Sequence, residues 1–172
     1  MKVVLLYGKS GSGKTTITRA LKNKYPYMFH IVESYTNRPA RYDGEDGHIF
    51  VDTDTIKDII NDDSMVVAST KYGDYFYCSS IKQFADNKIN LYVVDLRGIR
   101  DMLNYKTLHS KLGLELFIVE VKRDCINVSE SRSVRDVDVF KFSDFEGSVF
   151  INDGSVGGGV DVLGGLIFDF FW

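Results

Sequence analysis

The sequence contains little cysteine, proline or histidine. Its 172 residues hold two cysteines, two prolines and three histidines. Cys78 and Cys125 form neither a C-x-x-C pair nor a disulfide framework, which favours a reducing cytoplasmic location. His30 and His109 have no partners at ligand spacing, so neither predicts a metal site. Because no proline-rich or serine-rich linker divides the chain, we expect one continuous domain over residues 1–172.

Long apolar runs and an excess of positive charge are also missing. The apolar run at residues 1–7 is too short for a signal peptide or a membrane span. Asp161 and Asp169 interrupt the apolar C-terminal stretch, where the spacing of the large side chains favours an amphipathic helix over a membrane anchor. A formal net charge of -3 gives no whole-protein attraction to nucleic acid or anionic membranes. We therefore expect a protein that binds neither of them.

Apolar, strand-like runs alternate with helical patterns along the chain. This alternation predicts an α/β fold with a mostly parallel sheet flanked by helices. Three isoleucines recur at helical spacing within residues 53–61, behind Asp52 or Thr53 as a candidate N-cap. Strands are expected at residues 3–7, 31–32, 90–94, 114–121 and 148–151, and helices at residues 14–24, 53–61, 80–87 and 99–105.

Two stretches interrupt the alternation. Residues 34–80 are rich in Tyr, Arg, Asp and Gly and contain short strand-like pieces, which predicts a small inserted subdomain. Residues 122–142 carry dense charge with little periodicity, which is typical of a lid over a site.

The residues GKSGSGKTT at positions 8–16 satisfy the phosphate-loop pattern G-x-x-x-x-G-K-[ST]. A strand-like run precedes them and a helical pattern follows, so a simple connecting loop is the weaker interpretation. In such a loop, backbone N–H groups and the helix N-terminus converge on phosphate. Lys14 is expected to bridge the β- and γ-phosphates of ATP, and the Thr15 hydroxyl to bind Mg²⁺. The expected ATP-binding residues are Gly8, Ser10, Gly11, Ser12, Gly13, Lys14, Thr15 and Thr16.

Two further groups suit phosphate chemistry. Asp95 ends the strand-like run LYVVD, where a carboxylate can hold the metal ion, although capping of the following turn is an alternative. Arg38 and Arg41 lie three residues apart beside a proline, so both guanidinium groups can converge on one phosphate dianion. Such an R-x-x-R pair is weak alone, because most such pairs are solvated surface charges.

In their order, these motifs resemble the guanylate kinase family of nucleoside monophosphate kinases. The series is GKSGSGKT, S-x-T-x-R-x-x-R, GEDGHIFV, YFYCSS, VVDLRG and VFIND, and it spans residues 1–155. The resemblance implies a P-loop nucleotide kinase fold, with residues 34–80 as an inserted monophosphate-binding subdomain and residues 122–142 as a short lid. It also implies transfer of the ATP γ-phosphate to a nucleoside monophosphate, with ATP and Mg²⁺ as cofactors.

The resemblance assigns roles to individual residues. His48 falls near a tyrosine that family members add to the grip on the acceptor phosphate. Arg132 and Arg135 are implied to close on the transferred phosphoryl group; the alternative is that both belong to a solvated charged surface. The implied acceptor-binding residues are Ser34, Arg38, Arg41, Glu45, His48, Tyr77, Ser79 and Asp95. Asn152 and Asp153 are implied near the adenine of the donor. The implied catalytic residues are Lys14, Arg38, Arg123, Arg132 and Arg135.

Two departures from the family concern the acceptor base. Val67 occupies the position where the family has a glutamate that reads guanine, and Val93 replaces the first acid of its D-x-D. A GMP-like or dGMP-like acceptor is therefore favoured, with a broadened choice of base such as a viral deoxynucleotide kinase would have. The alternatives are a sugar-phosphate kinase on the same fold and a non-catalytic guanylate-kinase-like module that binds proteins. The intact phosphate loop disfavours the module.

Overall fold

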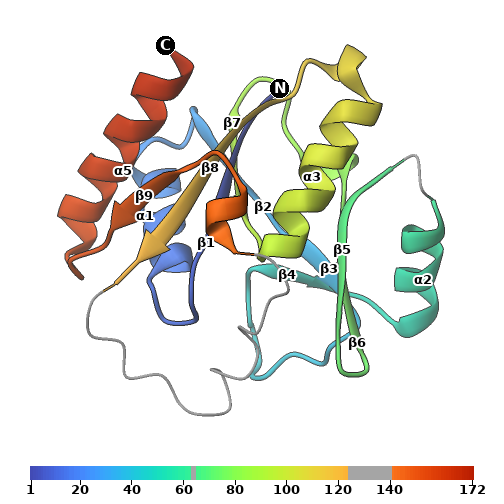
Figure 1. Cartoon of the computed structure of the whole chain (residues 1–172). Helices are drawn as coiled ribbons and strands as arrows, with labels where there is room; N and C mark the ends of the chain where they lie inside the picture. The colour runs from blue at the N-terminus through green and yellow to red at the C-terminus, as the bar shows by residue number, and fades with distance from the viewer. Residues whose placement is uncertain (63–64, 124–140) are drawn as a thin grey trace.

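The computed structural model describes residues 1–62, 65–123 and 141–172. In that part of the chain, a five-stranded parallel sheet has the order β2-β7-β1-β8-β9 (Figure 1). The expected α/β fold with a parallel sheet is therefore confirmed. The strands are β1 (Lys2–Tyr7), β2 (Phe29–Val32), β7 (Ile89–Val93), β8 (Glu115–Lys122) and β9 (Ser148–Ile151).

Helices cover both faces of this sheet, and the side-chain alternation of β1 shows why. Val4 and Leu6 belong to the apolar cluster that includes α1 (Lys14–Lys24) and α5 (Val156–Phe171). Val3 and Leu5 point the other way and join the cluster of α3 (Leu96–Leu108). All four side chains are fully buried. A central strand that is buried on both faces reads as a continuous apolar run, which is what VVLLY is.

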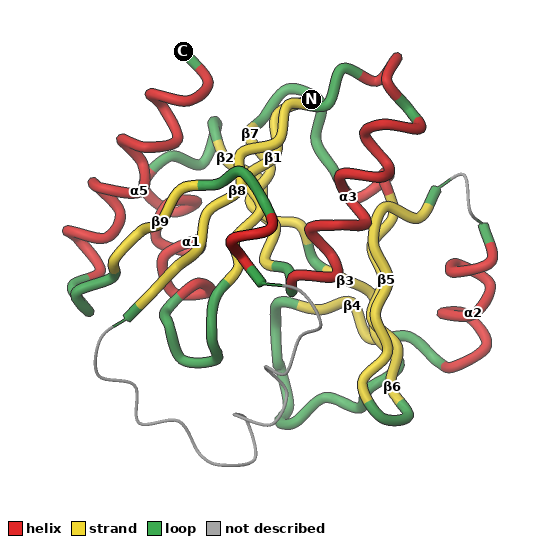
Figure 2. The backbone as a smooth tube through the Cα atoms, in the orientation of Figure 1, coloured by secondary structure: helices red, strands yellow, loops and turns green. Residues whose placement is uncertain are grey.

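A second, four-stranded sheet lies beside α3, as the tube in Figure 2 shows. Its order is β4-β3-β6-β5, with β3 and β4 parallel and the other pairs antiparallel. It packs on the core because Val67 and Ala68 of β5 join the apolar cluster of α3. Its elements are β3 (Ser34–Thr36), β4 (His48–Phe50), β5 (Val66–Tyr72), β6 (Tyr75–Ser80) and the helix α2 (Thr53–Asn61), all within the stretch that the sequence sets apart.

Helices α1 and α2 have the bounds that the sequence predicts. Asp52 is the N-cap of α2, because its Oδ1 accepts a hydrogen bond from the Thr55 N–H at 2.7 Å. The prediction of a helix at residues 80–87 is wrong. Only a 3₁₀ turn, Ile81–Gln83, follows β6. The buried side chain of Asn90 pairs with both the N–H and the carbonyl of Ala85, at 2.8 and 2.9 Å, so it fixes that backbone outside a helix.

The C-terminal stretch forms the expected helix. α5 begins with Ser155 as N-cap and buries Val160, Leu163 and Ile167 against the sheet. Gly159 lets this helix approach α1, since a Cβ there would lie 3.1 Å from Ile17 Cδ1. Within the described residues, every helix is too short or too polar to cross a membrane.

Candidate functional site

The phosphate loop connects β1 to α1 and adopts backbone angles that favour glycine. Gly8, Gly11 and Gly13 have φ values of 152°, 82° and 93°. A Cβ at Gly8 would lie 2.3 Å from the carbonyl oxygen of Val121, so the loop also presses directly on β8. The glycines of the motif are therefore required by backbone angle and by close packing.

The N-terminus of α1 has the donors that an anion needs. Gly13 is its N-cap residue, no described side chain caps the helix, and its first turn holds no acidic residue. The first N–H groups of a helix have no partner within the helix, and together with the helix dipole they attract phosphate. Thr15 is exposed in this turn, so its hydroxyl fits the role of a Mg²⁺ ligand beside a bound phosphate.

The Lys14 ammonium group lies over the loop. Its Nζ donates to the carbonyl oxygens of Gly8 and Lys9, the latter at 2.9 Å, and to Ser12 Oγ at 3.3 Å. The loop backbone therefore holds the only lysine of α1's first turn at the mouth of the anion site.

The side chain of Asn152 binds the backbone of the phosphate loop. Its side chain is buried, and Nδ2 donates to the carbonyl oxygen of Ser12 at 2.7 Å. Its Oδ1 accepts from the Gly154 N–H at 3.0 Å. The carboxamide is thus engaged by protein groups, and contact with adenine stays a prediction. Asp153 accepts from the Ser155 N–H at 2.8 Å in the turn before α5.

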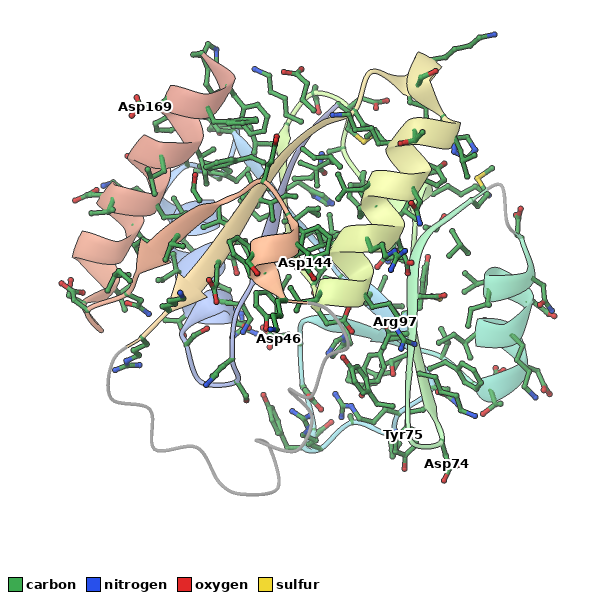
Figure 3. The ribbon with its side chains drawn as sticks, in the orientation of Figure 1. Asp46, Asp74, Tyr75, Arg97, Asp144 and Asp169 are labelled. Atoms are coloured by element: carbon green, nitrogen blue, oxygen red, sulfur yellow. The ribbon has the colours of Figure 1, made fainter. Side chains whose placement is uncertain are left out.

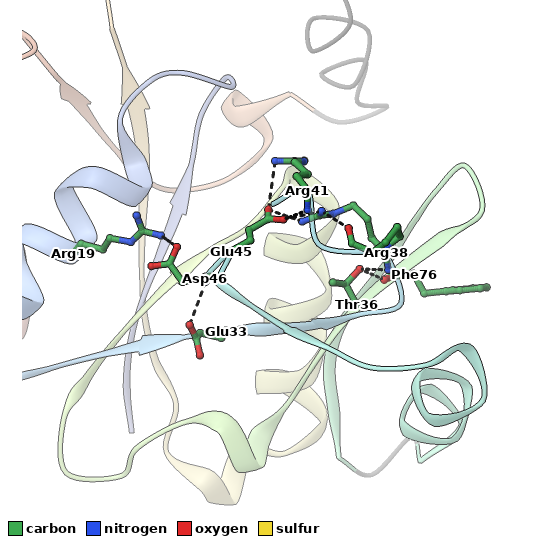
Figure 4. Close-up of polar contacts among 10 residues, drawn as sticks. Arg19, Glu33, Thr36, Arg38, Arg41, Glu45, Asp46 and Phe76 are labelled. Carbon is green, nitrogen blue, oxygen red and sulfur yellow. Dashed lines mark hydrogen bonds and ion pairs between the residues drawn. The ribbon is translucent and has the colours of Figure 1, made fainter. Parts of the chain in front are cut away.

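Arg38 is buried, and its guanidinium group is paired with Glu45. Nη1 and Nη2 donate to Glu45 Oε2 and Oε1 at 3.1 and 2.8 Å, and Nη1 also donates to the Pro39 carbonyl oxygen at 2.8 Å (Figure 4). The group also lies 5.3 Å from the centre of the Phe50 ring. This bidentate pair fixes the direction of Arg38 before any ligand arrives.

Arg41 and Glu45 complete this arrangement. The Arg41 N–H donates to Glu45 Oε2 at 2.6 Å, and its Nη1 lies 3.7 Å from Oε1, while half of the Arg41 side chain stays exposed. The Arg38 guanidinium group, followed by the Arg41 N–H, lowers the pKa of Glu45 to about 2. Glu45, expected to bind substrate, is therefore placed to position both arginines. Next to it, Asp46 pairs with Arg19 of α1 (Figure 4).

One cleft reaches both the phosphate loop and the arginine pair. It has a volume of about 840 Å³, and it is lined by Ser10 of the phosphate loop as well as by Arg38 and Arg41. Figure 3 shows Asp74 and Tyr75, which also line it, at the tip of the β5–β6 hairpin. The buried Arg38 thus lies on the wall of a cleft that reaches the lysine-bearing loop.

A chain of hydroxyl groups lies at the cleft, where Ser34 and Tyr92 are lining residues. The buried Tyr92 hydroxyl donates to Ser79 Oγ at 2.8 Å, and Ser79 donates to Ser34 Oγ at 3.1 Å. Burial raises the pKa of Tyr92 to about 12, so it remains a donor. Because Ser34 accepts in this bond, its own hydroxyl hydrogen is not used by it, and Ser34 lines the cleft. Ser79 is buried behind Ser34, and Tyr92 was not identified from the sequence because a tyrosine in an apolar strand reads as core.

Asp95 caps α3, which is the alternative that the sequence leaves open. Oδ1 accepts from the Gly98 N–H at 2.6 Å, and Oδ2 accepts from the Thr70 hydroxyl at 3.1 Å and from the Tyr72 hydroxyl. A role toward Mg²⁺ stays a prediction. Within residues 1–62, 65–123 and 141–172, no group of three or more His, Cys, Asp or Glu side chains is placed to hold a metal ion.

Several residues of the second sheet face the cleft. His48 and Tyr77 both line it, with their ring centres 5.6 Å apart. Cys78 lines it as well, and burial raises the pKa of its thiol to about 11, which keeps it unreactive. Val67 is buried in the apolar cluster of α3, whereas Thr70 on the same strand lines the cleft. Ala68, Ser69 and Tyr72 of β5 also line the cleft, whereas Val67 does not.

The arginines expected from the lid are placed only in part. Arg123 is exposed, and its Nη2 lies 3.0 Å from the position of a Cβ on Gly154, beside the turn that follows β9. Arg132 and Arg135, and most of the stretch 122–142, lie outside the described residues.

Comparison with known proteins agrees with this geometry. The sequence model of the family described as guanylate kinase matches residues 1–114 of the 172. The chain belongs to the guanylate kinase family. The guanylate kinase of Corynebacterium jeikeium is 30% identical to it over 108 residues, which is 59% of this chain and 57% of that protein. The guanylate kinase of Nostoc sp. is 26% identical over 106 residues, which is 59% of this chain and 53% of that protein. This family member thus spans about half the length of the curated relatives it matches.

A solved structure shares the fold of this guanylate kinase family member. The crystal structure of guanylate kinase from Anaplasma phagocytophilum superposes with a TM-score of 0.68, covering 99% of this chain and 87% of that one. The two sequences are 14% identical, so the match supports the fold alone. The shared fold includes both the parallel sheet and the smaller second sheet.

Proposed function

We propose that this protein is an ATP-dependent nucleoside monophosphate kinase, which moves the γ-phosphate of ATP to a nucleoside monophosphate. One observation carries the proposal: a single cleft is lined both by the phosphate loop, at Ser10, and by the arginine pair, Arg38 and Arg41. A donor phosphate and an acceptor phosphate bound at these two places would face one another. Family membership supports the same reaction class.

The donor would bind with its phosphates at the N-terminus of α1. Backbone N–H groups of the loop and the Lys14 ammonium group would surround the β- and γ-phosphates. Thr15 would hold Mg²⁺ together with phosphate oxygens, and the ion supplies neutralisation of the charge on those oxygens. Residues 34–80 serve in this proposal as the monophosphate-binding subdomain.

The acceptor would bind with its phosphate at Arg41 and Arg38 and its base toward Ser34. The Ser34 hydroxyl lines the cleft and accepts from Ser79, so its own hydrogen would be available to a carbonyl oxygen such as guanine O6. The Asp95 carboxylate already accepts three hydrogen bonds, from Gly98, Thr70 and Tyr72. It is therefore less available to read the N1–H and amino group of guanine, so we propose that guanine is accepted with a broadened choice of base.

The chemistry requires alignment and neutralisation of charge. An oxygen of the acceptor phosphate forms a bond to the γ-phosphorus while the bond to the β,γ-bridging oxygen breaks, which yields ADP and a nucleoside diphosphate. The acceptor oxygen is already a nucleophile, so no covalent intermediate with the protein is needed. Lys14 and Arg38 stabilise the charge that moves between the two sites.

A coupled assay of ADP release tests the proposal. Ribo- and deoxynucleoside monophosphates of each base are offered with ATP and Mg²⁺, together with a phosphorylated sugar. We expect several monophosphates to be substrates, with the guanine nucleotides among them. Lys14→Ala should lower the rate by at least about a hundredfold, because it removes one oriented charge from the transition state. Lys9→Ala, an exposed change in the same loop, is the matched control.

Each other outcome has a definite meaning. Turnover of the sugar phosphate alone would replace the nucleotide acceptor by a sugar phosphate. Absence of ATP-dependent transfer to every acceptor in the panel, with circular dichroism showing folded protein, would refute a kinase and leave a binding module.

A further inference from the structure

Two buried side-chain nitrogens in the described part of the chain have no hydrogen-bond partner, and both belong to residues that line the cleft. They are Arg38 Nε and His48 Nδ1. A buried polar atom without a partner is unfavourable by about 1–3 kcal/mol, so native proteins contain few of them. Two such atoms in one cleft indicate where a ligand supplies the missing partners.

Shared contacts bring these two residues to one place. The Arg38 guanidinium group lies over the Phe50 ring, and the ring centres of His48 and Phe50 are 6.2 Å apart. Tyr77 of β6 also contacts His48, with the two ring centres 5.6 Å apart. An acceptor phosphate held by Arg38 and Arg41 would therefore lie beside the imidazole.

Charged and polar groups from three parts of the chain surround His48. The loop between β3 and β4 contributes Arg38, Arg41 and Glu45, β6 contributes Tyr77, and β3 contributes the backbone of Ser34. Burial, followed by the charges of the two arginines, lowers the pKa of His48, while Ser34 and Glu45 act in the opposite direction. In the empty cleft the imidazole is therefore neutral near pH 7.

Within the described residues, the charges at the acceptor site do not balance those of a phosphate dianion. Its two arginines and one glutamate leave a net of one positive charge, whereas a phosphate monoester carries close to two negative charges above its second pKa of about 6. Glu45 is held by Arg38 and Arg41, so moving its carboxylate away from the arginines would be unfavourable. His48 lines the same cleft and can supply a further positive charge by taking up a proton.

We propose that His48 takes up a proton when the cleft binds a phosphate dianion, and then donates from Nδ1 to that dianion. The inference rests on the proposed function, because it gives the acceptor phosphate a third cationic partner. The bound anion offsets the arginine charges and accepts the Nδ1–H, so it favours the imidazolium form. The proton comes from solvent, and it returns there when the anion leaves.

Linkage fixes the sign of the pH dependence. Binding raises the pKa of His48, so the affinity for a dianion is greatest below the pKa of the empty cleft. The affinity then falls as the pH rises through the window between the pKa of the empty cleft and that of the complex, by up to about tenfold per pH unit. Above that window the affinity becomes independent of pH.

Sulfate is a suitable probe, because it is a dianion that does not titrate between pH 6 and 8. Titration calorimetry of the full chain with sulfate, in buffers of different ionisation heats, counts the protons taken up. We expect a clear fraction of one proton per sulfate near pH 7 in the wild type and none in His48→Gln. His109→Gln is the control, since His109 stacks on Tyr105 of α3 and does not line the cleft.

A second measurement needs no variant. The ¹⁵N resonances of the imidazole rings report the protonation state of His48 directly, and saturating sulfate or a nucleoside monophosphate should convert it from neutral to imidazolium at pH 7. A ring that stays neutral with the anion bound overturns the proposal, as does the absence of anion binding or equal proton uptake by the wild type and His48→Gln.

The proposed function fails on different observations. If monophosphates are phosphorylated and His48 stays neutral, the kinase assignment stands and the proton coupling is wrong. If sulfate binds with proton uptake at His48 and no acceptor is phosphorylated, the dianion site stands and the kinase assignment is wrong.

Discussion

The side-chain amide of Asn152 donates from Nδ2 to the carbonyl oxygen of Ser12 at 2.7 Å, so the end of β9 holds the phosphate loop in place. The two residues are 140 positions apart in the chain. A Cβ on Gly13 would lie 2.3 Å from the same Nδ2. The shape of the loop therefore depends on a residue outside its own motif.

Replacing Asn152 by Ala should weaken both the fold and the donor site. The change leaves the buried carbonyl of Ser12 without its partner, so the free energy of unfolding should fall by about 1–3 kcal/mol. The KM for ATP should rise more than the KM for the acceptor. Urea unfolding and steady-state kinetics measure these effects. Ile151→Ala is the control; it changes an exposed side chain at the end of β9, next to Asn152, and should change neither KM.

Glycines of α5 offer a test of helix packing. Gly165 has open space where a Cβ would be, so Gly165→Ala should stabilise the protein by roughly 0.5–1 kcal/mol through the unfolded chain. Gly159→Ala should be less stable than Gly165→Ala, because its Cβ would lie 3.1 Å from Ile17 Cδ1. Thermal unfolding of both variants decides this, and equal melting temperatures would show that α1 and α5 are not closely packed.

Local signals determine how much of the fold the sequence predicts. The bounds of α2 are predicted because Asp52 is an N-cap residue placed just before an apolar helical pattern. The error at residues 80–87 has a different origin. The capping box of Ser80 and Gln83 is a genuine start signal, but the side chain of Asn90 binds both backbone groups of Ala85 outside a helix, and that contact cannot be read from the order of residues.

The candidate site divides in the same way. The phosphate loop and the arginine pair are visible in the sequence because their chemistry depends on close spacing. The roles of Glu45 and Asn152 are not visible, since each depends on which group its side chain meets in the fold. The acidic run GEDG, in which Glu45 lies seven residues after Arg38 and four after Arg41, is the available signal for an arginine partner. Nothing local in the sequence indicates that Tyr92 orients Ser79 and Ser34.

Arg38 and Arg41 should respond differently to truncation. Arg38→Ala leaves buried Glu45 without its bidentate partner, so it should weaken both the fold and acceptor binding. The Arg41 side chain is half exposed, so Arg41→Ala should leave unfolding nearly unchanged and raise the acceptor KM about ten- to a hundredfold. Urea unfolding and acceptor kinetics separate the two effects. A large loss of stability in Arg41→Ala would show that it has a structural role.

Glu45→Gln should reveal its contribution to stability as a function of pH. The folded protein lowers the pKa of Glu45 from 4.5 to about 2, so folding favours the ionised carboxylate. A depressed pKa means that the unfolded state binds more protons, and the stabilisation is therefore fully present above about pH 4.5 and is lost as the pH falls toward 2. The wild type should exceed Glu45→Gln in free energy of unfolding by a constant amount between pH 5 and 7, and this difference should shrink steadily below about pH 4.5. Urea titrations at closely spaced pH values measure it. A difference that stays constant down to pH 3 would mean that the carboxylate is not held by Arg38 and Arg41 in solution, and the preformed acceptor site would then have no basis.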